Sequence, residues 1–184
     1  VIIWDPESGL SGSKFVEFLE STGRTGYDYV TGSLPSTEFY NTAFIFLGIY
    51  YDPSNHVLSQ NEADKFVSIL NNGGNVYMEG GDTWAFDSQT SLHGMFGANG
   101  ISDGTSDLGT VNGVAGTFTE GMSFSYNGGN SYIDHLSPSG GSFNILTNQS
   151  PSYVTAIAYD NEAAGYRTIA ASHELGGLQG DDAD

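Results

Sequence analysis

Residues 75–82 are the feature that most constrains the fold, because they join an apolar strand directly to a Glu-Gly-Gly turn. Val76–Met78 is apolar enough for a buried strand, and Gly80–Gly81 allows a tight turn directly after it. At the carboxyl end of a parallel strand, such a turn would place Glu79 and Asp82 over the edge of the sheet. We therefore expect the pocket of the domain at this edge.

The first half of the chain alternates between strand and helix patterns. Residues 1–4 are a continuous apolar run, which is typical of a strand buried on both faces, and residues 43–50 have the strongest strand pattern in the chain. Ser59 and Glu62 match a capping box ahead of apolar residues at helical spacing. This succession predicts one α/β domain over residues 1–184, with a mainly parallel sheet and helices on both of its faces.

The composition changes between residues 97 and 141, where Gly, Ser, Asn and Thr dominate. We interpret this segment as an insertion packed on the edge of the sheet or over its carboxyl ends. Beyond it, the strand-like segments 154–159 and 166–172 flank a turn, which predicts an antiparallel hairpin added to the sheet. Because the chain begins directly with a predicted strand, we expect a domain excised from a larger protein.

The charge balance excludes several classes of partner. The chain carries 22 Asp and Glu against 4 Lys and Arg, a formal net charge of −18. Such a surface repels phosphate groups, so nucleic acid is not an expected partner. Membrane insertion is not expected either, since no apolar run is long enough for a membrane helix. The acidity is typical of a secreted or cell-surface protein kept soluble by its charge. The absence of cysteine removes disulfides, thiolate catalysis and thiolate metal sites.

Three groups of residues resemble the class I glutamine amidotransferase-like superfamily, a flavodoxin-like group that includes DJ-1-type domains. They are Glu7 after the first strand, the turn at 76–81, and the segment 168–174, where the family carries its catalytic His and Glu. The resemblance implies a flavodoxin-like fold with the nucleophile position in the turn. The sequence Glu-Leu-Gly-Gly-Leu at 174–178 is similar to divergent, non-catalytic members found in secreted multidomain proteins.

The departures from this family argue against its chemistry. Glu79 stands where the family has a thiolate, and a carboxylate is a poor nucleophile toward an amide. His173 and Glu174 are adjacent, so in a strand they would face opposite sides. Glutaminase activity is therefore not expected. We expect a non-catalytic accessory or recognition domain, whose partners are other domains of the same polypeptide or an extracellular ligand.

Two alternatives stay open. One is a hydrolase in which Glu7, Glu79 and His173 act as acid and base, although Glu79 could simply accept hydrogen bonds from backbone amides of its turn. The other is a calcium-stabilised structural domain with Asp103 and Asp107 as oxygen ligands in a flexible loop. No organic cofactor is expected, and calcium is the one ion that we consider.

Overall fold

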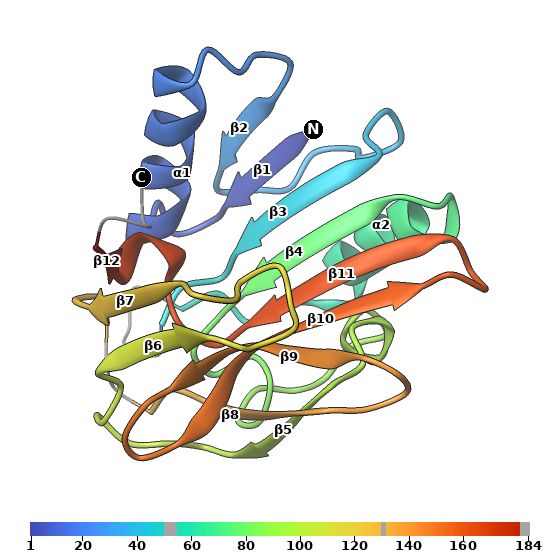
Figure 1. Cartoon of the computed structure of the whole chain (residues 1–184). Coiled ribbons are helices and arrows are strands. Elements are labelled where there is room, and N and C mark those ends of the chain that lie inside the picture. Colours follow the sequence, from blue (N-terminus) through green and yellow to red (C-terminus); the bar gives the residue numbers. More distant parts are fainter. Residues whose placement is uncertain (50–54, 130–131, 181–184) are drawn as a thin grey trace.

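The computed structural model describes residues 1–49, 55–129 and 132–180, which form one twelve-stranded mixed sheet with two α-helices (Figure 1). The sheet has a parallel half built mainly from the first strands of the chain and an antiparallel half built from later ones. The two halves are continuous in hydrogen bonding, so they belong to one structural unit.

The parallel half has five strands. In order across the sheet they are β2 (Asp28–Thr31), β1 (Ile2–Asp5), β3 (Thr42–Phe46), β4 (Asn75–Glu79) and β11 (Tyr166–Ala171). All four residues of β1 are buried, as expected for an apolar strand covered on both faces. The strand predicted at residues 43–50 is shorter, because β3 ends at Phe46, and residue 50 lies outside the described residues.

One helix covers each face of the parallel half. The two helices are α1 (Leu10–Ser21) and α2 (Gln60–Asn71). The ring of Phe15 in α1 lies 4.4 Å from that of Phe44 in β3. The ring of Phe66 in α2 lies 5.7 Å from that of Trp4 in β1. Ile45 follows Phe44 on the opposite side of β3 and shares a core cluster with Phe66, so the helices lie on opposite faces.

The antiparallel half holds the remaining strands. They are β5 (Ala98–Ser102), β6 (Thr110–Gly113), β7 (Ser123–Tyr126), β8 (His135–Pro138), β9 (Phe143–Asn148), β10 (Tyr153–Asn161) and β12 (Leu178–Gln179). The order across the sheet is β12-β7-β6-β9-β10-β11-β4-β3-β1-β2, with β5 and β8 beside this path (Figure 1). β11 pairs antiparallel with β10 on one side and parallel with β4 on the other, so it joins the two halves.

The prediction of an α/β, flavodoxin-like fold with a mainly parallel, helix-covered sheet is wrong. Most strands lie in the antiparallel half, and the described residues contain only two α-helices, so the fold is mostly sheet. Residues 97–141, which we interpreted as an insertion, supply β5, β6, β7 and β8 to the same sheet. These strands have only four or five residues each, and the glycine-rich segments between them leave each strand too short to show a clear alternation of buried and exposed side chains.

Two hydrophobic cores lie on opposite faces of the sheet. Val76 and Met78 of β4 belong to the first core, whereas Tyr77 between them packs against the second. The first core also contains Trp84, which follows the Glu-Gly-Gly turn. The second contains Val111 and other side chains of the antiparallel half. Across the described residues, neither helix has the length and apolar character needed to span a membrane.

Candidate functional site at the carboxyl edge of β4

The turn that follows β4 is held closely against neighbouring elements. The amide of Gly80 donates a hydrogen bond to the carbonyl of Ala171 at 3.1 Å. A Cβ atom on Gly81 would lie 3.0 Å from the side chain of Ile49, so a larger residue would have to displace it. The two glycines therefore allow the chain to turn within the packed core, where a side chain at Gly81 would press on Ile49.

Glu79 is buried and bonded within the domain. Only 1% of its surface is exposed, and its Oε2 atom accepts hydrogen bonds from the Tyr77 hydroxyl at 2.7 Å and the Leu175 amide at 2.8 Å. Burial raises the pKa of Glu79 to about 8, although three hydrogen bonds, led by that from Ser11, favour the charged form. Glu79 therefore holds its proton at neutral pH. It ties the short turn η2 (Leu175–Gly177) to the end of β4.

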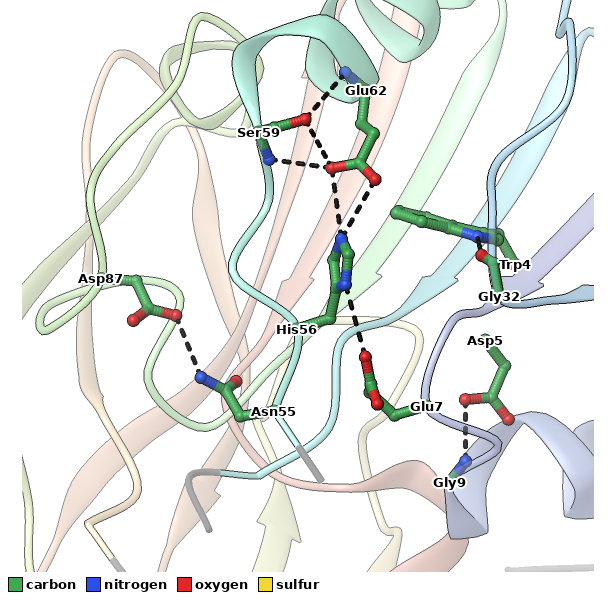
Figure 2. A network of polar contacts seen from close by, with 10 residues as sticks. All are labelled: Trp4, Asp5, Glu7, Gly9, Gly32, Asn55, His56, Ser59, Glu62 and Asp87. Atoms are coloured by element: carbon green, nitrogen blue, oxygen red, sulfur yellow. Dashed lines mark hydrogen bonds and ion pairs between the residues drawn. The ribbon is translucent and has the colours of Figure 1, made fainter. Parts of the chain in front are cut away.

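Glu7 lies in a different network, which links the end of β1 to the start of α2 (Figure 2). Its carboxylate lies 3.5 Å from Nδ1 of His56, and Nε2 of the same ring lies 3.2 Å from Glu62. Glu62 also accepts a hydrogen bond from the Ser59 amide at 2.9 Å, as part of the capping box that the sequence predicts. The Glu7 side chain is 32% exposed, so it serves as a surface partner for His56.

His173 is buried, and its Nδ1 atom has no hydrogen-bond partner. Burial lowers the pKa of His173 to about 4, so the imidazole is neutral at pH 7. The adjacent Glu174 accepts a hydrogen bond from the Gly129 amide at 2.6 Å. In the part of the chain that the structure describes, no hydrogen bond or ion pair joins Glu7, Glu79 and His173 to one another. The structure does not connect these three residues directly.

Three aspartates from separate segments meet beside the turn. Asp82 follows the two glycines, Asp103 follows β5, and Asp134 precedes β8. Each offers a carboxylate oxygen, and these oxygens all lie within 4.8 Å of one another. Asp82 and Asp134 are 1% and 0% exposed, whereas Asp103 is exposed. We call these three residues the aspartate cluster.

Hydrogen bonds from the turn hold Asp134 in the cluster. Its Oδ2 atom accepts from the amides of Trp84 at 2.8 Å and Ala85 at 2.7 Å. The amide of Asp134 donates to the carbonyl of Gly81 at 2.9 Å. Trp84 is itself anchored, because its indole nitrogen donates a hydrogen bond to the carbonyl of Ala171 at 2.8 Å. The turn after β4, the end of β11 and the start of β8 are thereby connected.

The aspartate cluster concentrates negative charge in a buried place. Burial raises the pKa of Asp82 to about 7, and the charge of Asp134 is the next largest cause. Burial also raises the pKa of Asp134 to about 7, against the hydrogen bonds from the Ala85 and Trp84 amides. Close carboxylates in a poorly solvated place cannot all ionise easily unless a positive charge joins them. Such an arrangement can share protons or bind a cation.

Of the two aspartates predicted as calcium ligands, only Asp103 lies in the aspartate cluster. Asp107 accepts hydrogen bonds from the Tyr153 hydroxyl at 3.0 Å and the Thr105 hydroxyl at 2.9 Å, so it stabilises its own loop. Sequence reasoning missed Asp134, because it lies far along the chain from Asp82 in no ligand-like spacing. The residues around it, Tyr-Ile-Asp-His-Leu at 132–136, form no continuous apolar run and no ligand spacing that would have pointed to a site.

Comparisons with known proteins establish the fold. No protein-family model and no curated protein matches the sequence. Several solved structures are similar over most of this chain, among them the following three. The mmIFT52 N-terminal domain has a TM-score of 0.62 at 13% identity, over 95% of this chain and 86% of its own. Exo-β-1,4-mannosidase Op5Man5 from Opitutaceae bacterium strain TAV5 has a TM-score of 0.63 at 11% identity, over 96% of this chain and 31% of its own. A ThuA-like protein from Parabacteroides merdae has a TM-score of 0.57 at 13% identity, over 93% of this chain and 77% of its own. At such low identities, these likenesses show a shared fold alone.

Proposed function

We propose that this chain is a non-catalytic accessory or recognition domain of a larger, secreted or cell-surface polypeptide. The observation that carries the proposal is the environment of Glu79, the residue that the resemblance in sequence aligns with the nucleophile of the glutamine amidotransferase-like family. A buried, protonated carboxyl group that is bonded to Tyr77 and Leu175 is a structural tie between elements. It is poorly suited to attack a substrate, because a nucleophile must be ionised and accessible.

The comparisons support a domain of a longer chain. The similar mmIFT52 structure is an N-terminal domain, and the similar part of Op5Man5 is only 31% of that chain. By analogy, the partners that we propose are other domains of the same polypeptide or an extracellular ligand. The net charge of −18 favours a partner that is not itself acidic.

A hydrolase built on Glu7, Glu79 and His173 is the competing proposal, and an activity comparison separates the two. We expect the domain to hydrolyse ester, glycoside and γ-glutamyl amide substrates no faster than its Glu79→Gln variant between pH 5 and 9. The physical reason is that Glu79 accepts hydrogen bonds from Tyr77 and Leu175, and no hydrogen bond or ion pair among the described residues links it to Glu7 or His173. The measurement is the initial rate on chromogenic substrates of each class. A rate at least tenfold above that of an equally folded variant would support the hydrolase.

The buried Glu79 also predicts how stability depends on pH. Its pKa is about 8 in the folded state and 4.5 in an unfolded chain, so folding favours the protonated form. The stability that it contributes is fully present below pH 4.5 and is lost as the pH rises through 8. Each pKa unit corresponds to about 1.4 kcal/mol, and the loss between pH 6 and 8 spans about two units, so the wild type should lose about 3 kcal/mol relative to Glu79→Gln between pH 6 and 9.

Urea denaturation of both proteins at several pH values measures this difference. Both proteins keep the aspartate cluster, so its own titration cancels in the comparison. Parallel stability curves from pH 6 to 9 would show that Glu79 is ionised in the folded state, which would remove the main support for a structural role.

A further inference from the structure

The aspartate cluster contains two buried oxygen atoms without a hydrogen-bond partner. Among the described residues, Oδ1 of Asp82 and Oδ1 of Asp134 are both buried and have no hydrogen-bond partner. Oδ2 of Asp134 is used by two backbone amides, so Oδ1 is its free atom. Buried polar atoms are nearly always paired, and a buried carboxylate without a partner is costly. These two oxygens are therefore available to a ligand.

No positive side chain of this chain pairs with the aspartate cluster. The chain has four Lys and Arg residues, and all four lie within the described ranges. Lys14 donates to the carbonyl of Gly176, Lys65 donates to the carbonyl of Leu34, and Arg167 pairs with Asp160. Arg24 is exposed and forms no ion pair with the cluster. A positive charge that balances these carboxylates must therefore come from a bound ion or from protons.

We propose that Asp82, Asp103 and Asp134 bind one divalent cation, and that this cation is Ca²⁺. The proposal rests on the convergence of three carboxylates and on the two unpaired buried oxygens. It is independent of whether the domain is catalytic. The cluster offers only oxygen ligands, which suit hard cations, whereas the nitrogen and sulfur ligands typical of zinc are absent from it.

The shape of the cluster favours Ca²⁺ over Mg²⁺. Ca²⁺ accepts six to eight oxygens in irregular geometry, whereas Mg²⁺ demands a near-ideal octahedron and gives up its waters reluctantly. Two ligands of the cluster are buried and held by a packed turn, so they adapt poorly to a strict geometry. The third, Asp103, is exposed, which leaves a side on which water can complete the coordination.

Calorimetric titration of the chelator-treated domain with CaCl₂, in buffer with 150 mM NaCl, tests the proposal. We expect one saturable site per chain and a rise in melting temperature with Ca²⁺, because a ligand that binds the folded state stabilises it. The variants Asp82→Asn and Asp103→Asn should each weaken the affinity at least tenfold. Asp103 is exposed, so its variant should fold even if changes at the buried positions do not.

Two variants control for the general acidity of the protein. Asp107→Asn removes the aspartate that is bonded to Tyr153 and Thr105, and Glu38→Gln removes an exposed charge elsewhere. Both should bind Ca²⁺ with wild-type affinity. The proposal is overturned if the wild type shows no saturable binding up to 10 mM Ca²⁺, or if Asp103→Asn binds as tightly as the controls. Equal affinity for MgCl₂ and CaCl₂ would overturn the assignment to Ca²⁺.

Discussion

Replacing Trp84 by alanine is expected to lower the free energy of unfolding by about 3 to 5 kcal/mol, the usual cost of removing a large buried aromatic side chain. Trp84 is 3% exposed and packs against Phe96, with ring centroids 5.3 Å apart. Its indole nitrogen also donates to Ala171, at the end of the strand that joins the two halves of the sheet. The variant therefore loses packing and an anchor of the turn together.

Two further variants show whether the loss of stability is specific to the buried Trp84 side chain. Trp84→Phe keeps most of the ring but loses the indole hydrogen bond, so it should cost about 1 to 2 kcal/mol. Phe39→Ala removes an aromatic side chain that is 91% exposed, and it should change stability by less than about 0.5 kcal/mol. Urea unfolding followed by circular dichroism gives all three values. A loss below 1 kcal/mol for Trp84→Ala would mean that the turn is not anchored by this residue.

Substituting Gly100 by alanine is expected to cost about 3 kcal/mol, at the upper end of the range for overpacking a core. A Cβ atom at this position would collide with the backbone carbonyl of Trp84, which cannot move aside as a flexible side chain would. β5 and the turn after β4 would have to separate. Because the amides of Trp84 and Ala85 hold Asp134, the variant should also weaken Ca²⁺ binding.

Gly94→Ala is the matched control for this substitution. A Cβ atom on Gly94 would meet no atom within 4 Å, so the variant should be as stable as the wild type or slightly more stable. Thermal unfolding of both variants provides the comparison. If Gly100→Ala is as stable as Gly94→Ala, the close approach of β5 to the turn is not present in solution.

The parts of the fold that the sequence predicts well are those with a strong local signal. The buried strand at residues 2–5 follows a continuous apolar run, and α2 starts at the capping box of Ser59 and Glu62. The turn at Gly80–Gly81 is also where the sequence places it. In each case, neighbours along the chain determine the structure, so the pattern can be recognised without knowledge of distant residues.

The antiparallel half shows where local patterns fail. β6 has four residues, of which only Val111 is fully buried, and its partners lie in β7 and β9. Such strands are fixed by pairing with distant segments and not by their own propensity. The same limit applies to the aspartate cluster. Asp82 and Asp103 are recognisable as acidic loop residues, but Asp134 joins them only because β8 is placed beside the turn.

The position of β11 between the two halves has a consequence for how the chain folds. β11 comprises residues 166–171, and its parallel partner β4 comprises residues 75–79, so this contact closes a very long loop. Non-local pairings of this kind slow folding, because the entropy of closing the loop is lost before the contacts are gained. During synthesis, the edge of β4 stays open until the last part of the domain has been made. An open strand edge can pair with other chains, so the domain is most exposed to aggregation in that interval.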